Sequence, residues 1–509
     1  MRSAWIVFAL IFAISPALAG GTDGKLILEN WDTAYLNDGK AGYVRTITRE
    51  LEFDGMKVLH TTVEMRLTVK RFNDTLQMAM DTGSTETHDG AVLGVFMRQF
   101  LGKEQKLLVE GTVVGKQLRL VKDGKVPLLA APWRADVIGY FKQQSIFKDR
   151  TLEPGTKFTY QSFEPSINLV LKTEVHVHGH REVILNGSKA KRKLLLVEVT
   201  PDRVEFKSGG KIERIQLPVS MTWLDEKFEP VKTEFEIPML GPIVLVRSTK
   251  EQALAPGPIA QLTDLGMSQL VRLKSRIVDA HQTRSAVYRV TVRGDDNVAT
   301  TFSNDNRQQV KNVRGNSFDL LVNANGKLSE SAKAEKEPDA ECSQSSYFIN
   351  SKDSKVQALA REAVGAETDG WRKAIRIERW VHANMRFANH ESLATADHVA
   401  RTLEGDCTEH AMLTAAMCRA QGIPSRTAIG LVYAEVKRAP CFGFHMWTEV
   451  WIAGQWLAID ATIGKGGIGA AHLKITDHSW HETVTMTPIF PVIRVVGRVT
   501  IDVLSAESR

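Results

Sequence analysis

The sequence predicts an α+β fold, in which a β-rich antiparallel N-terminal region precedes a C-terminal domain of helices followed by strands. Hydrophobic residues recur with a period of two from about residue 25 to 255, and with a period of 3.6 between residues 355 and 385. The chain has 509 residues, of which 43% are hydrophobic and 24% charged. This composition excludes a predominantly disordered chain and leaves room for several domains with real cores.

The N-terminal region at 22–255 reads as antiparallel strands with one wet face. Val63, Met65, Leu67 and Val69 alternate with polar residues, as a half-buried strand requires. Three dipeptides are typical hairpin turns: Asp123-Gly124, Asn186-Gly187 and Gly209-Gly210. The region contains no motif that carries chemistry.

The remainder of the chain divides into three further segments. Ala255-Pro256-Gly257-Pro258 opens a linker with a short β region at 256–340, which ends in a stretch rich in Ser, Ala, Lys and Glu. We expect the main C-terminal domain at 341–485, with amphipathic helices over 355–364 and 371–385 and strands from about residue 429, and a tail at 486–509.

The charge balance excludes an obvious nucleic-acid binder. Lys and Arg total 65 against 59 acidic residues, a net charge of +6 without a long basic run. The densest basic cluster fits the rim of a hairpin better than a nucleic-acid surface. It consists of Lys189, Lys191, Arg192 and Lys193.

The first nineteen residues resemble a secretory signal peptide. A positive start at Arg2 is followed by an apolar run from Trp5 to Ile14 and by Ala17-Leu18-Ala19, a small-x-small cleavage site. No later stretch approaches the ~18 to 20 consecutive apolar residues of a membrane span. We therefore expect an exported protein, periplasmic or extracellular, with no transmembrane span after cleavage.

One histidine row falls in the β-rich region. His176, His178 and His180 are two residues apart, so on a regular strand they would share a face. A metal site is one interpretation, but three imidazoles in a row give poor closed coordination without further ligands. We favour a solvated strand face, and expect no metal and no organic cofactor.

The segment from Gly405 to Glu409 predicts the start of a helix that runs to Gln421. Asp406 is a suitable N-cap, and Glu409 three residues later completes a capping box. Cys407 then occupies the first helical position, where the helix dipole and a nearby imidazolium can favour a thiolate. Cys407 is therefore a candidate nucleophile, the alternative being a capped helix with an idle cysteine.

Two predicted strands supply partners for a thiol. His445, Trp447 and Glu449 share one face of the first strand. Gly454-Gln455 resembles a hairpin turn, and antiparallel pairing about it would place Asp460 near His445. A carboxylate beside a histidine holds its ring and stabilises the imidazolium, as in other nucleophile–base–orienter triads.

These motifs resemble the core of the transglutaminase-like superfamily, over roughly residues 345–470. The resemblance is carried by Gly405-Asp406-Cys407, Gly422-Ile423-Pro424-Ser425-Arg426, His445-Met446-Trp447-Thr448-Glu449-Val450, Asp460-Ala461-Thr462 and the glycine-rich segment 464–469. It implies a papain-like arrangement with Cys407 as nucleophile, His445 as general base and acid, and Asp460 as orienting acid. We expect Trp447 and Glu449 to line or brace the substrate cleft.

The resemblance implies an exported thiol enzyme that acts on amide or peptide bonds through a thioester on Cys407. Hydrolysis and transfer to a second amine both stay open, and a protein or peptide is the expected substrate. The calcium sites of animal transglutaminases are not discernible. The alternative is a catalytically inactive scaffold that serves as a binding or assembly module. The oligomeric state is open.

The chain has three further cysteines, which we expect to be dispensable for catalysis. Cys418 follows Cys407 by eleven residues on the same predicted helix, ~16 Å away, so the two cannot form a disulfide. Cys441, if paired at all, is expected to pair with Cys342. Cys441 follows a proline in a segment that lacks the helix N-terminus available to Cys407.

Overall fold

The computed structural model describes residues 24–508 except for 73, 101–105, 125, 129, 187, 189, 209–210, 238–239, 326–334, 389–392, 482 and 484–486. The predicted signal peptide lies outside the described residues. So do Lys189, Gly187 and the predicted Gly209-Gly210 turn. Among the described residues, no helix is both long and apolar enough to span a bilayer.

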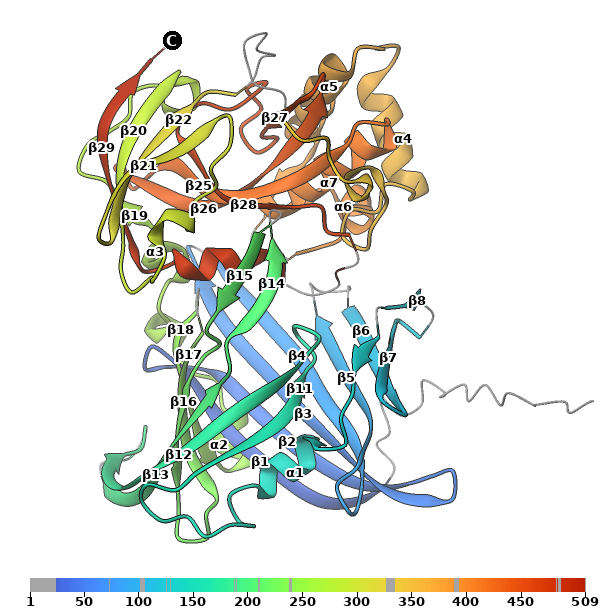
Figure 1. Ribbon diagram of the computed structural model, residues 1–509, viewed down its shortest axis with the longest axis vertical. Helices are drawn as coiled ribbons and strands as arrows, with labels where there is room; N and C mark the ends of the chain where they lie inside the picture. Colours follow the sequence, from blue (N-terminus) through green and yellow to red (C-terminus); the bar gives the residue numbers. More distant parts are fainter. Residues whose placement is uncertain are drawn as a thin grey trace, which may run out of the picture.

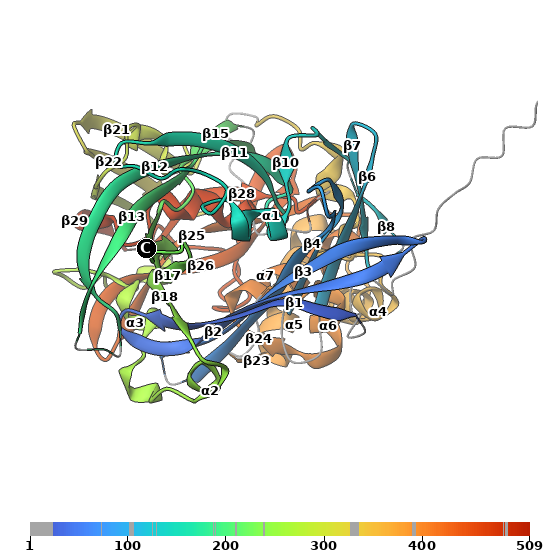
Figure 2. The same ribbon diagram turned by 90° about the horizontal axis from the view of Figure 1, so that it is seen from below.

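The N-terminal half of the described chain folds into one sheet of sixteen strands, which curves strongly around (Figures 1 and 2). Its order is β10-β11-β12-β13-β16-β17-β18-β1-β2-β3-β4-β5-β6-β7-β8, with β9 on β7. Its strands are β1 Lys25–Leu36, β2 Gly39–Phe53, β3 Met56–Arg71, β4 Asp74–Thr87, β5 Val92–Phe100, β6 Lys106–Val114, β7 Gln117–Lys122, β8 Val126–Pro127, β9 Ala131–Pro132, β10 Val137–Ile138, β11 Lys157–Glu164, β12 Leu169–Ile184, β13 Lys191–Pro201, β16 Ser220–Leu224, β17 Pro230–Ile237 and β18 Gly241–Ser248.

The pairing in this sheet is antiparallel except between β10 and β11, which agrees with the predicted period of two. Leu67 and Val69 of β3 are buried, as their alternation predicts. Asp123 and Gly124 both have positive φ, at 48° and 68°, which a tight hairpin turn after β7 requires. The helix α1, Tyr140–Ser145, contacts β3 and β4, and the Glu86 carboxylate accepts hydrogen bonds from its first backbone N–H groups.

The C-terminal half combines helices with a second antiparallel sheet (Figure 1). The predicted helices form as α4, Ser354–Val364, and α5, Gly370–Asn384; they are followed by α6, Ala396–Thr402, and α7, Cys407–Ala420. The sheet has the order β19-β26-β25-β28, with β27 paired to β26. Its strands are β19 Val271–Arg272, β25 Ser425–Val436, β26 Ala439–Ile452, β27 Gln455–Ile459 and β28 His472–His478. Helix α7 packs between this sheet and the other three helices, and is buried along most of its length.

The short β region predicted within 256–340 forms, but it belongs to a larger sheet that also includes a strand from the predicted tail at 486–509. Strands β20, Ser285–Val292, β21, Gln308–Arg314, and β22, Ser317–Asn323, form a four-stranded sheet with β29, Val499–Glu507. The order is β21-β22-β20-β29, so the last described strand pairs with one more than 200 residues earlier. These segments are therefore part of the C-terminal fold, because pairing over such a separation leaves no local sequence signal.

The two halves share one apolar core. A single cluster of buried side chains includes Met97 and Leu107 of the curved sheet together with Leu413 and Val450 of the C-terminal half. Lys122 of β7 also lies 3.8 Å from the ring centroid of Tyr347, which precedes α4. The sheet is thus packed against the helical part of the C-terminal half rather than joined to it by a tether alone.

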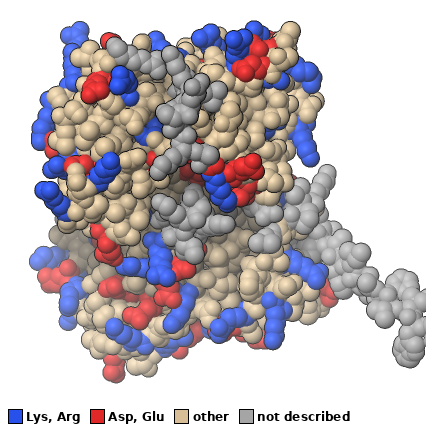
Figure 3. Space-filling model, turned by 45° about the horizontal axis from the view of Figure 1, so that its top comes forward, with Lys and Arg blue, Asp and Glu red and all other residues tan. Residues whose placement is uncertain are grey.

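The surface carries both signs of charge side by side. On the face in Figure 3, the described Lys and Arg side chains are scattered among Asp and Glu and gather into no extended basic surface. This distribution agrees with the mild net charge of the sequence.

Candidate active site

Cys407 lies at the N-terminus of the buried helix α7. The Asp406 side chain accepts hydrogen bonds from the backbone N–H groups of Thr408, at 2.8 Å, and of Glu409. The Glu409 side chain accepts one from Asp406 N at 3.0 Å, and this reciprocal pair is the predicted capping box. Cys407 itself is partly exposed, whereas the helix beyond it is buried. A substrate can therefore reach this thiol, and the positive end of the α7 dipole lies beside it.

His445 and Asp460 meet behind the thiol, on adjacent strands. Strand β26 turns at Ala453 and Gly454 into β27, and Thr448 pairs with Ile459, so that Asp460 follows directly after β27. The Nε2 atom of His445 lies 2.7 Å from Oδ2 of Asp460, and both side chains are less than a tenth exposed. The hairpin thus brings Asp460 to His445 as the sequence predicts.

The charges of these groups support one another. Burial by itself would lower the pKa of His445, but the Asp460 carboxylate and a hydrogen bond to Cys407 outweigh it and raise the pKa well above its usual range. Burial would raise the pKa of Asp460, but the charge and hydrogen bonds of His445 and His472 hold it well below its usual range. An imidazolium and a carboxylate are therefore the favoured forms of this pair.

His472 is a member of the site that sequence reasoning missed. It begins β28, and its Nε2 atom lies 3.0 Å from Asp460 Oδ2, the oxygen that also contacts His445. Burial lowers the pKa of His472 to about 4, so the ring is neutral near pH 7. In the sequence, the only sign of a role for His472 is its position shortly after the glycine-rich segment. A single histidine at such a position is not enough to assign it to the site.

Glu378 of α5 holds the loop that contains Asp460 and was also missed. Its Oε1 accepts hydrogen bonds from the backbone N–H groups of Asp460 at 3.3 Å and Gly466 at 3.2 Å. Burial raises the pKa of Glu378 to about 7. The signal in the sequence is an acidic residue within the buried face of an amphipathic helix, beside Ile377 and Val381.

Trp447 and Glu449 lie behind the site rather than on an open cleft wall. Trp447 is 1% exposed and stacks on the His445 ring, with centroids 6.4 Å apart. The Glu449 carboxylate is buried and paired with Arg426 at 2.7 Å and with Lys474 at 2.9 Å. Because both side chains are buried, we interpret them as braces of strand β26. Their burial does not support direct contact with a substrate.

Arg71 is a third residue that the sequence did not suggest. It is the last residue of β3 in the N-terminal sheet, yet its Nη1 atom lies 2.5 Å from Oδ2 of Asp406, the N-cap of α7. The two residues are 335 positions apart in the chain. The curved sheet therefore delivers a cation to the immediate neighbourhood of Cys407.

The three other cysteines are buried and unbonded. Cys342, Cys418 and Cys441 are all free thiols, so the conditional pairing of Cys441 with Cys342 does not occur. The Cys441 thiol instead hydrogen bonds to the Ala434 carbonyl of the neighbouring strand at 3.4 Å. Burial raises the pKa of the Cys342 thiol to about 11, which keeps it protonated and unreactive.

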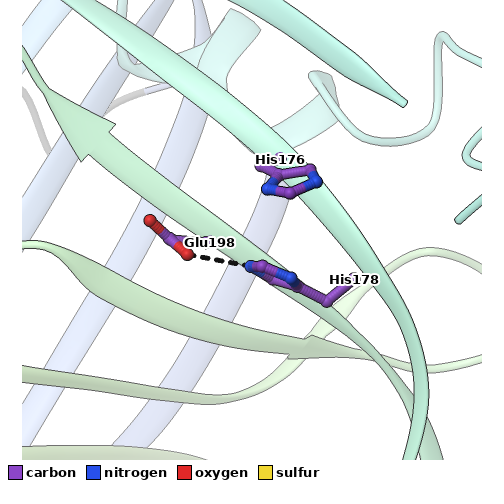
Figure 4. A group of neighbouring side chains, drawn as sticks. All are labelled: His176, His178 and Glu198. Atoms are coloured by element: carbon purple, nitrogen blue, oxygen red, sulfur yellow. Dashed lines mark hydrogen bonds and ion pairs between the residues drawn. The ribbon is translucent and has the colours of Figure 1, made fainter. Parts of the chain in front are cut away.

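Two groups of described residues bring potential metal ligands within 4.8 Å of one another. The first consists of His445, Asp460 and His472. Its two hydrogen bonds already occupy the ligand atoms, and a metal there would break the contact that orients His445. The second consists of His176, His178 and Glu198 (Figure 4).

The second group corrects one expectation. A bulge between Val177 and Gly179 shifts the register, so that His180 pairs with Leu195 and leaves the face of His176 and His178. Glu198 of β13 takes its place, and the His178 Nε2 atom lies 2.8 Å from its carboxylate (Figure 4). We interpret this group as a hydrogen-bonded cluster on a solvated strand face, because all three side chains are only partly buried.

A cavity of about 850 Å³ lies elsewhere, between β15, Lys211–Ile215, and β17 of the N-terminal half and the segment around Arg494. Arg203, Arg498 and Glu236 are among its lining residues, and Cys407, His445 and Asp460 are not. It is therefore separate from the candidate active site.

Comparisons with known proteins place one part of the chain in a known superfamily. Residues 357–461 match the family model of the transglutaminase-like superfamily. No curated protein matches the chain.

The solved structures that it resembles include one from Cytophaga hutchinsonii, provisionally assigned as a cysteine protease, with 16% identity, 43% of this chain and 82% of that chain covered, and a TM-score of 0.29. Another is the periplasmic domain of TgpA from Pseudomonas aeruginosa, with 14% identity, coverages of 36% and 92%, and a TM-score of 0.23. A third is a β-barrel-like protein of a domain of unknown function from Brucella abortus, with 9% identity, coverages of 43% and 95%, and a TM-score of 0.30. These similarities are weak, and the assignment rests on the family model: residues 357–461 form a domain of the transglutaminase-like superfamily.

Proposed function

We propose that this protein is an exported thiol enzyme that acts on amide or peptide bonds through a thioester on Cys407. The observation that carries the proposal is the buried His445–Asp460 pair, 2.7 Å apart, behind a partly exposed thiol at a helix N-terminus. An imidazolium held by a carboxylate can stabilise a neighbouring thiolate, which is the reactive form of cysteine.

The proposed reaction has two halves. The Cys407 thiolate attacks the carbonyl carbon, and the backbone N–H of Cys407 at the start of α7 is the donor best placed for the developing oxyanion. The C–N bond breaks as His445 gives its proton to the leaving amine. Water or a second amine, deprotonated by His445, then attacks the thioester and releases the acid or the new amide together with the free thiol.

The rival function is an inactive scaffold that binds a partner. Burying an ionised carboxylate is costly unless it is paired, and a scaffold gains nothing from two histidines that converge on Asp460. This cost favours an enzyme over a scaffold. Export is part of the proposal, and it is supported by the signal-like pattern of residues 1–19.

One experiment separates these functions. The purified mature protein is incubated with unfolded protein substrates, with and without a fluorescent primary amine, beside the Cys407→Ala variant. Release of new amino groups indicates hydrolysis, and covalent incorporation of the fluorescent amine indicates transfer. If iodoacetamide labels Cys407 of the folded protein no faster than the buried Cys342, the proposal is wrong and the scaffold is favoured.

A further inference from the structure

The end of strand β3 is fixed by Asp264, in the segment that follows the N-terminal sheet and packs against it. The backbone N–H of Phe72 donates to the Asp264 carboxylate at 2.8 Å, and Lys70 forms a parallel β-bridge with Asp264. Asp264 in turn caps the short helix α3, Leu265–Ser268, by accepting from Met267 N at 3.1 Å. Arg71 stands between these two contacts, so its side chain has a defined starting point.

From that position the Arg71 side chain reaches Asp406, the residue directly before the thiol of Cys407. Its ion pair with Asp406 is only 32% exposed on the arginine side and 5% exposed on the aspartate side. Burial alone would lower the pKa of Arg71, but the charges of Asp406 and Cys407 and the hydrogen bond to Asp406 raise it. The guanidinium is therefore paired with the N-cap and close enough to Cys407 for the two charges to interact.

Without a cation, this neighbourhood would oppose a thiolate. Asp406 precedes Cys407 directly, and a carboxylate beside a thiol disfavours its ionised form. Glu409 adds no second charge, because burial and the Asp406 charge raise its pKa well above its usual range. The remaining charged groups at the thiol are the His445 imidazolium, backed by Asp460, and Arg71.

We propose that Arg71 is a positioning residue of the active site, supplied by the N-terminal sheet, that neutralises Asp406 and provides a second cation for the Cys407 thiolate. The active site is then complete only when the sheet is docked, which gives the N-terminal half a role in catalysis. This inference rests on the proposed function.

The test compares two alkylating reagents on Cys407, read by peptide mapping. Iodoacetate is an anion and iodoacetamide is neutral, so the ratio of their rates reports the local charge around the thiolate. In Arg71→Met we expect this ratio to fall by about threefold. We also expect the pH midpoint of iodoacetamide labelling to rise by about one unit, which lowers the labelling rate by about tenfold at pH values below the wild-type midpoint.

The chain offers a closely matched control. Arg66 lies on the same strand and pairs with Asp81 at 2.6 Å, with exposures of 31% and 6%, and Arg98 remains as a second partner of Asp81. Arg66→Met removes a comparable ion pair far along β3 and should leave both the rate ratio and the pH midpoint unchanged. Arg71→Lys keeps the positive charge and should retain most of the wild-type ratio.

A rescue separates charge from structure. In the Arg71→Met background, Asp406→Asn removes the uncompensated carboxylate but keeps a good N-cap, so it should bring the pH midpoint back down. A purely structural role for Arg71 would show no such recovery. Should Arg71→Met fail to fold, as judged by circular dichroism, Arg71→Gln is compared with Arg71→Lys in the same assay.

The two failures are distinguishable. A wild-type Cys407 that is no more reactive than Cys342 overturns the proposed function. A reactive wild-type Cys407, with the same ratio and midpoint in folded Arg71→Met or Arg71→Gln, overturns the role of Arg71 alone.

Discussion

The Nε2 atom of His472 lies 3.0 Å from Oδ2 of Asp460, the oxygen that also contacts His445. Because Asp460 is ionised and burial keeps His472 neutral near pH 7, His472 donates its Nε2–H to the carboxylate. Its Nδ1 atom has no hydrogen-bond partner among the described residues. His472 therefore serves to hold Asp460 in the orientation that His445 requires.

Removal of the His472 donor should slow the chemical step. His472→Phe should lower kcat by about tenfold with little change in KM, because Asp460 loses one of its two imidazole partners. His472→Gln keeps an N–H donor and should lose less. Equal activity of the two variants and the wild type, at equal thermal stability, would show that the contact has no role in catalysis.

Cys407→Ala and His445→Ala should each lower kcat by at least about a thousandfold. Nucleophile and base act as a unit, so either loss removes nearly all of the covalent pathway. Steady-state assays on variants with unchanged circular dichroism test this. Substantial turnover by folded Cys407→Ala would exclude the thioester mechanism, and Cys418→Ala serves as the control for losing a buried thiol.

Asp460→Asn should lower kcat by about tenfold to a hundredfold less than Cys407→Ala does. The amide cannot stabilise the imidazolium, although part of the His445 orientation survives. It should also move the alkaline limb of kcat/KM to lower pH, because the Asp460 carboxylate helps to raise the pKa of His445 against burial. An unchanged alkaline limb would mean that His445 does not carry that ionisation.

Cys407, His445 and Asp460 could be predicted from the sequence, because each is placed by a short local motif. A capping box spans four residues, and a hairpin places Asp460 opposite the strand of His445. Arg71 could not be found, because its contact with Asp406 depends on how a curved sheet docks onto another fold. The sequence also could not show that His180 lies on the opposite face of β12 from His176 and His178. That change of face comes from a β-bulge, which does not alter the pattern of alternating residues.

Buried neutral histidines should make the fold sensitive to acid. Burial lowers the pKa of His60 to about 4, well below its usual 6.5, so the unfolded chain binds more protons between these values. The free energy of unfolding should therefore fall as pH is lowered from about 6.5 to about 4. Urea unfolding across this range should show a weaker pH dependence for His60→Gln, and an identical dependence would contradict the assignment.

Cys342 and Cys441 should both be thiols in the native protein, and neither should be needed for turnover. Both are buried, and burial raises the pKa of each thiol, so iodoacetamide should label them only after denaturation.

The alternative nucleophile is tested by one substitution. Cys441→Ser should keep wild-type activity, because a hydroxyl can replace the thiol as a donor to the Ala434 carbonyl. Cys441 is the alternative candidate for the nucleophile, because it lies on β26 only four residues before His445. Cys441 lies within strand β26, and the part of the chain that the structure describes places no helix N-terminus and no arginine–aspartate pair beside it, so its thiolate lacks the support that Cys407 receives. Loss of turnover in folded Cys441→Ser, with Cys407→Ala still active, would reverse the assignment of the nucleophile.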